Sequence, residues 1–576
     1  MDKQEIKKLV EKAVLSAQKE GKLPSFDMPE IIIECPDREE HGDYSTNIAF
    51  SVSKLVGKPS QFVAAVIKEE LQDEFGDLVT VLPPGFINFK VSKDELIDSL
   101  KEIIKKGAEY GRQKQDKTVV IDYSAPNIAK PFGVGHLRST IIGQALFNIY
   151  QFLGWKCIGD SHLGDWGTQF GKLIVAIKKW GDKGLEKLTI DDLENLYVRF
   201  HAESESDETL IDEARDWFKK LEQGDKEARK IWEFCVALSK KEFDRVYKIL
   251  GIKIDYALGE SFYEDKMADV LDDVEKLGIA KKSQGALVIP LKDIDTPLML
   301  LKSDGATTYE TRDLATSKYR KEKWSPDLLI YEVGADQKYY FTKVFKASGM
   351  LGYGKKEQYV HVAHGLIRWK DRKFSTRRGD TIKLEDILNE AVKKAKEFIL
   401  ETHKKRGEIR ADEKGSFEGP IEEIAKIIGI GAVKYNDLSR HYSRDIVFDL
   451  DKMISLQGNS GPYIQYTAVR CNSILKKGKK KKVTSFKIDS LNKEEKSVLR
   501  ALRKFPEIVQ QAGDNFSPNI ICNFVFDLAQ RYNLFYEKHS ILEGENKDFR
   551  IALTKAVLQI LENSLNLLGI EIPKKM

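Results

Sequence analysis

The sequence predicts a multidomain protein with an α/β core, a helical insertion in that core, an N-terminal α+β domain and a C-terminal all-α helical bundle. With 576 residues the chain is too long for one hydrophobic core, so we expect about three domains. From residue 118, a buried-strand pattern, a loop, an amphipathic helix and a second strand pattern follow one another, which is typical of a parallel sheet covered by helices. From about residue 420 onwards, nearly every segment has helical periodicity.

Residues 1–112 have the pattern of a small α+β domain. Two apolar segments, EIIIECP at 30–36 and LVTVLPPGFINFKVS at 78–92, are strand-like, and a helical stretch at about 60–74 lies between them. An opening helix is predicted by the apolar residues that recur on one of its faces, Val10, Val14 and Ala17.

The α/β core opens with TVVIDYS at 118–124, an apolar run suited to a strand that is buried on both faces. A loop follows, and then a helix whose apolar positions are Leu137, Ile141, Ala145, Leu146 and Ile149. Further strands are predicted at 155–163, 285–291, 327–334 and 358–365. The charged, helical residues 182–250 interrupt this alternation, so we expect an inserted helical unit.

Composition excludes several classes of protein. The net charge is only +4, so a nucleic-acid surface would have to be a local basic patch. The five cysteines are scattered without a C-x-x-C pair, which argues against a disulfide framework and a zinc site. The N-terminus lacks the apolar core of a signal peptide, and no apolar run is long enough for a transmembrane helix. We expect a reduced, soluble, cytoplasmic protein.

The loop SAPNIAKPFGVGHLRST at 124–140 has the features of a phosphate site. It joins a buried strand to a helix, and glycines let a ligand approach the backbone at the positive end of the helix dipole. It is neither a G-x-G-x-x-G loop nor a Walker loop, but it holds His136 at the helix start and Lys130 six residues earlier. A lone histidine is most often structural; this setting favours a phosphate contact.

A second basic loop, DRKFSTRRGDTIKLEDIL at 371–388, follows the last strand of the core. Most such runs are solvated loops. The alternative is a clamp that stabilises charge developing on a triphosphate. Each loop alone is a weak signal, but one after the first strand and one after the last together indicate ATP chemistry.

These motifs resemble the class I aminoacyl-tRNA synthetases, and within them the arginyl-tRNA synthetases. GVGH at 133–136 stands where that class has HIGH, and KFSTR at 373–377 where it has KMSKS. The sequence segments that flank these motifs match the arginyl family more specifically. Arginyl-like segments are SAPNIAKPF at 124–132, HLRSTIIG at 136–143, GDWGTQFG at 164–171, DGATTYETRDLA at 304–315, GDYSTNIAF at 42–50, PPGFINF at 83–89, GNSGPYIQYTAVR at 458–470 and LLGIEIPKKM at 567–576.

The resemblance implies a Rossmann-like nucleotide-binding catalytic domain at 113–420, a tRNA-binding N-terminal domain at 1–112 and a helical anticodon-binding domain at 421–576. It also implies an arginine–tRNA ligase that uses L-arginine, ATP and tRNA(Arg), with Mg²⁺ carried by ATP, no zinc, no membrane partner and a monomeric state. The first step, arginyl-adenylate formation, usually requires bound tRNA in this family.

The site residues follow from the same resemblance. The catalytic set is His136, Lys130, Lys373, Ser375 and Arg377. The ATP-binding set is Pro126, Phe132, Gly133, Val134, Gly135 and His136. The arginine-binding set is Asp122, Asn127, Tyr309, Asp313 and Gln337. The tRNA-binding set is Tyr463, Gln465, Asn533 and Tyr536. No protein residue is expected to bind a metal.

The arginine set also has a physical rationale. A guanidinium is best held by carboxylates that accept two parallel hydrogen bonds, which the point charge of lysine cannot form. Asp313 lies four residues after Tyr309, so the two share a face if that stretch is helical. Asp122 ends the first core strand, directly before the phosphate loop.

The sequence departs from the family pattern at several positions. Gly133 replaces the first histidine of HIGH, and Thr376 replaces the second lysine of KMSKS. In members that lack that lysine, a lysine upstream of HIGH is thought to supply the charge, and here this is Lys130. Tyr340 stands where a histidine is frequent, and Asp122 where a glutamate is frequent.

Two alternative functions remain open at this stage. One is a nucleotidyltransferase of the same fold that acts on a small molecule, although it would need neither flanking domain. The other is an inactive RNA-binding paralogue, which Gly133 suggests and the retained His136, Lys130, Asp122 and Asp313 disfavour.

Overall fold

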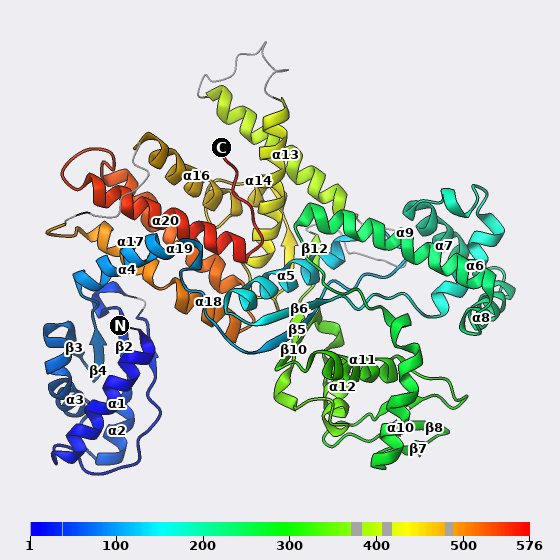
Figure 1. Ribbon diagram of the computed structural model, residues 1–576, viewed down its shortest axis with the longest axis horizontal. Coiled ribbons are helices and arrows are strands. Elements are labelled where there is room, and N and C mark those ends of the chain that lie inside the picture. Colours follow the sequence, from blue (N-terminus) through cyan, green and yellow to red (C-terminus); the bar gives the residue numbers. More distant parts are fainter. Residues whose placement is uncertain (1, 37, 370–382, 406–417, 479–485, 487) are drawn as a thin grey trace. The chain divides into compact units, whose positions relative to one another are not determined.

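The computed structural model describes residues 2–36, 38–369, 383–405, 418–478, 486 and 488–576 (Figure 1). The chain divides into two compact units. The first comprises Met1–Tyr110, Ile474–Lys504 and Gln530–Gln559; the second comprises Gly111–Ser473, Phe505–Ala529 and Ile560–Met576. Each unit therefore combines segments that are distant in sequence, and the functional division at residues 112 and 420 stays a prediction.

The first unit contains an antiparallel sheet covered by helices. Its strands, in the order β1-β2-β4-β3, are β1 Ile33–Glu34, β2 Tyr44–Thr46, β3 Val79–Leu82 and β4 Phe86–Phe89. The helices of this part are α1 Lys3–Lys19, α2 Ile48–Val56, α3 Ser60–Phe75 and α4 Lys93–Lys106. The predicted face of α1 is buried, with Val10, Val14 and Ala17 all at 0% exposure. Strand β2 and helix α2 were not predicted, and β1 is shorter than the apolar run that contains it.

The second unit is built on a four-stranded parallel sheet in the order β11-β10-β5-β6. These strands are β5 Thr118–Asp122, β6 Lys156–Asp160, β10 Leu328–Gly334 and β11 Tyr359–His364. Helix α5, Leu137–Phe152, follows β5 and is buried along most of its length. On one face of the sheet, Val120, Leu329 and Tyr331 pack with Phe341 of α12, Lys338–Met350. The predicted α/β core is confirmed.

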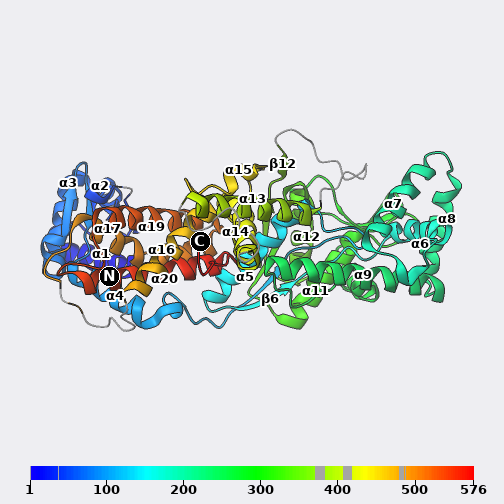
Figure 2. The same cartoon turned by 90° about the horizontal axis from the view of Figure 1, so that it is seen from above.

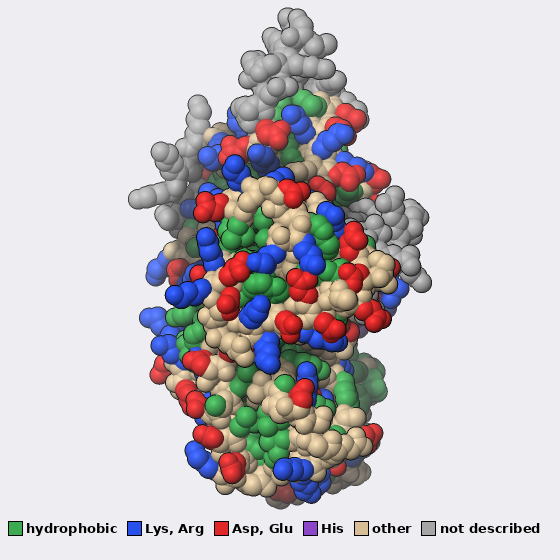
Figure 3. Space-filling model, turned by 90° about the vertical axis from the view of Figure 1, so that its right-hand side faces the viewer, with side chains coloured by type: hydrophobic (Ala, Val, Ile, Leu, Met, Phe, Trp, Pro, Cys, Tyr) green, Lys and Arg blue, Asp and Glu red, His purple; other side chains and the backbone are tan. Residues whose placement is uncertain are grey.

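The helical insertion begins earlier than predicted. It comprises α6 Thr168–Trp180, α7 Ile190–Ser204, α8 Thr209–Glu222 and α9 Lys226–Leu250, which lie side by side in both ribbon views (Figures 1 and 2). Helix α6 belongs to this group because it packs against α7 and α8. On the face of the molecule that includes this insertion, Lys and Arg side chains alternate with Asp and Glu rather than forming a patch of one sign (Figure 3).

A second, antiparallel sheet follows the insertion. Its strands are β7 Lys281–Ser283, β8 Ala286–Ile289 and β9 Leu298–Leu301, with α10 Met267–Leu277 before them and α11 Tyr309–Trp324 after them. The strand predicted at 285–291 therefore lies outside the parallel sheet. Leu298 and Leu300 of β9 join Leu314 of α11 in a hydrophobic cluster that supports the start of α11.

The C-terminal part is mainly helical, as predicted, with one exception. Strand β13, Ile446–Phe448, pairs in parallel with β12, Ile367–Trp369. The helices are α13 Leu384–Lys405, α14 Glu418–Leu438, α15 Leu450–Met453, α16 Gly461–Lys477, α17 Lys493–Arg503, α18 Phe505–Asp514, α19 Asn519–Lys538 and α20 Lys547–Leu567. Among the described helices, none combines the length and apolar character needed to cross a bilayer.

Candidate active site

The loop between β5 and α5 is held in a strained conformation by neighbouring helices. Ser124 and Ala129 have φ angles of 57° and 61°, in the left-handed region that non-glycine residues seldom adopt. The Ser124 hydroxyl lies 2.9 Å from that of Tyr247, and the Ala129 amide donates to the Ser239 hydroxyl at 2.8 Å. Since Tyr247 and Ser239 belong to α9, the insertion helps to fix the loop.

The start of α5 is open to solvent at Gly135. This glycine is exposed, and none of the described residues places an atom within 4 Å of the position that a Cβ would take. A short 3-10 turn, Val134–His136, runs directly into α5. Amide groups and the positive end of the helix dipole therefore meet at an unobstructed surface, which suits a phosphate group.

His136 is a neutral imidazole at this helix start. Its ring packs edge-on against Phe132 at 5.4 Å between centroids, and its Nδ1 is buried without a hydrogen-bond partner among the described residues. Burial, aided by the charge of Lys130, lowers the pKa of His136 to about 4. Near pH 7 the ring can therefore offer a hydrogen bond to a phosphate oxygen without carrying a charge.

Lys130 and Asn127 lie on the side of the loop that faces the insertion. Both line a small cavity of about 70 Å³ together with Tyr197 of α7. The Lys130 ammonium lies 5.2 Å from the centroid of the Tyr197 ring, a cation–π contact. Asn127 pairs with Gly164, where a Cβ would lie only 2.1 Å from the Asn127 Oδ1. The glycine of GDWG is therefore required for this close approach.

The KMSKS-like residues Lys373, Ser375, Thr376 and Arg377 lie outside the described residues. The first described residue after them, Lys383, forms a β-bridge with Gly133, and the Leu384 amide donates to the Phe132 carbonyl at 3.0 Å. Gly133 itself has an extended backbone, with φ −82° and ψ 159°. Any residue can adopt this conformation, so the backbone does not require glycine at position 133.

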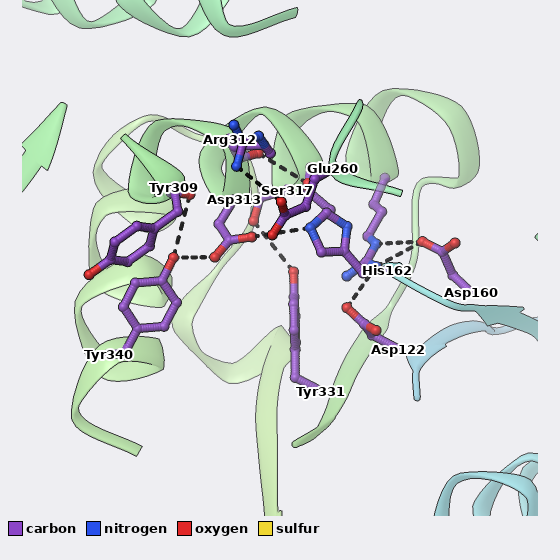
Figure 4. A network of polar contacts seen from close by, with 12 residues as sticks. Asp122, Asp160, His162, Glu260, Tyr309, Arg312, Asp313, Ser317, Tyr331 and Tyr340 are labelled. Carbon is purple, nitrogen blue, oxygen red and sulfur yellow. Dashed lines mark hydrogen bonds and ion pairs between the residues drawn. The ribbon is translucent and has the colours of Figure 1, made fainter. Parts of the chain in front are cut away.

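Asp313 and Tyr309 do share a face of α11, and a third side chain joins them (Figure 4). The Tyr340 hydroxyl donates a hydrogen bond to Asp313 Oδ2, and the rings of Tyr340 and Tyr309 are 5.3 Å apart. The other oxygen, Asp313 Oδ1, lies 3.7 Å from His162 Nε2. Burial raises the pKa of Asp313. Tyr309 is 62% exposed, so one of the two aromatic rings beside this carboxylate faces solvent.

Asp122 is engaged by a buried arginine (Figure 4). Arg320 of α11 is fully buried, and its Nη2 lies 2.8 Å from both Asp122 Oδ2 and Asp160 Oδ2. Asp122 and Asp160 are paired at the carboxyl-terminal ends of β5 and β6, so the two residues lie side by side at the same end of the parallel sheet. The Arg320 guanidinium lies 5.1 Å from the centroid of the Tyr331 ring.

The surroundings of Asp313 carry more negative than positive groups. Their carboxylates are Asp122, Asp160, Glu260, Glu264 and Asp313, and their guanidiniums are Arg312 and Arg320. Burial raises the pKa values of Asp160, Glu260 and Asp313, as expected for carboxylates that are incompletely compensated. A cationic ligand would lower this electrostatic cost, so the site favours a substrate with positively charged groups.

The structure brings only part of the predicted arginine set together. Asp122, Tyr309 and Asp313 belong to one polar network, whereas Asn127 lies on the phosphate loop. Gln337 is exposed at the start of α12. The sequence reasoning missed His162, Asp160 and Arg320. For Asp160 there was a usable signal, because it is an acidic residue within the predicted strand at 155–163, the next strand along the chain after the one that contains Asp122.

The tRNA-binding candidates differ in accessibility. Gln465 is fully buried, and its side-chain amide donates to the carbonyls of Ile427 and Glu571. This contradicts the expectation that Gln465 contacts tRNA, because its amide is already used inside the protein. Tyr536 is 40% exposed. Tyr463 and Asn533 are half-buried.

Comparison with known protein families gives three matches along the chain. Residues 99–450 match the catalytic domain of class I tRNA synthetases (R). Residues 464–576 match the DALR anticodon-binding domain, and residues 4–91 match the arginyl-tRNA synthetase N-terminal domain.

Individual proteins agree with these matches. An arginine–tRNA ligase of Clostridioides difficile is 40% identical over 556 residues, which cover 95% of this chain and 96% of that relative. The crystal structure of arginyl-tRNA synthetase from Plasmodium falciparum has a TM-score of 0.85 at 27% identity, covering 100% of this chain and 99% of the other. The Thermus thermophilus arginyl-tRNA synthetase shares the fold, with a TM-score of 0.82 at 21% identity and complete coverage of both chains.

Proposed function

Since the chain belongs to the arginyl-tRNA synthetase family, we propose that it attaches L-arginine to tRNA(Arg) in two steps that use ATP. In the first step, the arginine carboxylate attacks the α-phosphorus of ATP, and the bond to the β-phosphate breaks to release pyrophosphate. In the second step, the terminal ribose hydroxyl of tRNA attacks the acyl carbon, loses its proton, and AMP leaves. The intermediate is arginyl-adenylate. The enzyme acts by positioning and electrostatic stabilisation and needs no nucleophile of its own.

The ATP phosphates bind at the start of α5. The open position at Gly135 and the neutral imidazole of His136 support this assignment. Lys130 supplies positive charge from the insertion side. Lys373 and Arg377 supply it from the other basic loop, where the Ser375 hydroxyl adds a hydrogen-bond donor. The site is completed by the loop residues Pro126, Phe132, Gly133 and Val134. Mg²⁺ arrives with ATP, bound to its phosphates.

Arginine binds between α11 and the edge of the parallel sheet. Asp313 accepts the guanidinium, with Tyr309 and Gln337 beside it, and Asp122 and Asn127 hold the α-amino and carboxylate ends. The excess of carboxylates in this network is the observation that carries the assignment, because arginine brings two positive groups. Asp122 Oδ2 accepts a hydrogen bond from Arg320, so Asp122 Oδ1 is the oxygen that accepts from the α-ammonium group of arginine.

Transfer RNA binds along the flanking parts of the chain. Tyr463, Asn533 and Tyr536 are the candidates for stacking with or hydrogen-bonding to anticodon bases. Residues 421–576 form the anticodon-binding domain and residues 1–112 contact another part of the tRNA, with residues 113–420 as the catalytic domain. We propose a monomer that works in the cytoplasm, where translation consumes charged tRNA.

One assay tests the function. Purified enzyme, ATP and tRNA are incubated with labelled arginine, lysine or glutamine, and radioactivity in tRNA is counted; attachment of arginine alone is expected. If none of the three amino acids is attached but tRNA binds tightly, the protein is an RNA-binding paralogue. Adenylyl transfer to a small molecule would indicate a nucleotidyltransferase. Pyrophosphate exchange without tRNA measures the first step separately, and little exchange is expected.

The phosphate loop gives a second prediction. Replacing His136 with alanine is expected to slow adenylate formation by about 100- to 1000-fold, the effect of removing one preorganised donor at a charge-developing oxygen. Lys130→Met is also expected to slow adenylate formation. Gly133→His on the same loop is expected to change the rate little, because the backbone at residue 133 has an extended conformation that any residue can adopt. Single-turnover kinetics with tRNA present measure the step; a large gain from Gly133→His would contradict this assignment of the loop.

A further inference from the structure

Tyr340 contributes its hydroxyl to the carboxylate that we assign to the arginine guanidinium. The hydroxyl donates to Asp313 Oδ2 and lies 3.5 Å from the Tyr309 carbonyl (Figure 4). Tyr340 is in α12, whereas Asp313 and Tyr309 are in α11. The contact therefore ties the carboxylate of one helix to the neighbouring helix.

Asp313 receives little other support. Its Oδ1 lies 3.7 Å from His162 Nε2, beyond hydrogen-bond distance. Among the described residues, the hydrogen bond to this carboxylate comes from Tyr340. Without that donor, the Asp313 carboxylate would lose this hydrogen bond in a largely buried position and keep the longer contact with His162.

We propose that Tyr340 is a positioning residue for arginine, whose hydroxyl orients the Asp313 carboxylate so that its remaining lone pairs can receive the guanidinium. This inference rests on the proposed function, since it assumes that Asp313 binds arginine. It assigns Tyr340 to the amino-acid pocket.

The hydrogen-bonding capacity of a carboxylate permits this arrangement. An ionised aspartate has about four acceptor positions on its two oxygens. Tyr340 occupies one of them, and a guanidinium that binds with two parallel N–H groups occupies two more. Tyr340 and the substrate are therefore complementary rather than competing donors.

The groups around Asp313 also indicate that the Tyr340 hydroxyl helps to keep the carboxylate ionised. Burial raises the pKa of Asp313, and the nearby Asp122 raises it further, whereas His162, the Tyr340 hydrogen bond and Arg312 lower it. Glu260 is a further acidic group beside it. Removing the Tyr340 hydroxyl removes one group that favours the ionised carboxylate, while the other groups stay in place.

Position 339 offers a matched control on the same helix. Tyr339 is 53% exposed, and its hydroxyl lies 2.8 Å from that of Thr296, away from Asp313. Tyr340→Phe and Tyr339→Phe each remove one hydroxyl and keep the ring, so packing with neighbouring aromatic side chains is preserved.

The experiment measures arginine attachment with ATP and tRNA for wild type, Tyr340→Phe and Tyr339→Phe. Tyr340→Phe is expected to raise the arginine KM by about 10-fold, the equivalent of one hydrogen bond to a charged group, with kcat and the ATP KM unchanged. The acid limb of kcat/KM for arginine is expected to move to higher pH, because Asp313 must be ionised and now takes up its proton more readily. Tyr339→Phe should match wild type in both readouts.

Three outcomes would overturn the proposal. An unchanged arginine KM and pH profile in Tyr340→Phe would show that the hydroxyl is not used, and a lower arginine KM would show that it competes with the substrate. Equal losses for ATP and arginine would indicate a general structural role. Asp313→Asn separates this inference from the proposed function: if it binds arginine as well as wild type does, the arginine site itself is misassigned.

Discussion

Arg320→Met is expected to lower the free energy of unfolding by about 3 to 5 kcal/mol, the cost of breaking a buried ion pair by removing one partner. Arg320 and Asp160 are fully buried in the wild-type protein, and Asp122 is nearly so. Methionine fills much of the same volume, but it leaves two carboxylates without a cation. Urea denaturation followed by tryptophan fluorescence measures the loss.

An exposed ion pair provides the control for this variant. Arg245 forms close contacts with Glu242 and Glu385, at 2.8 and 2.6 Å, but its side chain is 43% exposed. Arg245→Met should therefore cost no more than about 1 kcal/mol. The deficit of Arg320→Met should also shrink as the pH falls, because unpaired buried aspartates have raised folded pKa values and take up protons more readily in the folded state. Equal losses for the two variants at pH 7 would contradict the role assigned to burial.

The parallel core was predictable because its signals are local and strong. Val119, Val120 and Ile121 form an uninterrupted apolar run, and all are essentially inaccessible in the structure. Strand β13 was missed for the opposite reason. Its three residues are too few to establish a period of two, and their pairing with β12 depends on a segment far away in sequence.

The polar interior of the site was less predictable. The local sequence around Arg320, TSKYRKE, has the composition of an exposed helix surface. Its partners Asp122 and Asp160 are 198 and 160 residues away, so only the fold brings the charges together. Gln465 shows the converse error. An amide between aromatic residues suits an unstacked base, but it equally suits two buried carbonyls, and the sequence does not distinguish these environments.

Asp313→Asn is expected to raise the arginine KM by at least about 100-fold, in the range measured when one partner of a buried, hydrogen-bonded charge pair is removed. Asparagine keeps the size of the side chain, but it offers one acceptor oxygen and turns an N–H₂ donor toward a guanidinium that is itself only a donor. The variant should also lose its preference for arginine over lysine, because the two-point pairing that separates them is gone. Attachment assays at varied arginine and lysine concentrations measure both effects.

Asp304 supplies the comparison for this substitution. It is an exposed aspartate in the turn before α11, where its carboxylate accepts the Ala306 amide at 3.0 Å. Asp304→Asn changes the same charge near the same helix, and its arginine KM should stay at the wild-type value. Should Asp313→Asn keep a wild-type arginine KM, the guanidinium must bind elsewhere. The Asp122 carboxylate would then be the next one to test, and a selective effect of Tyr340→Phe on arginine would have no basis.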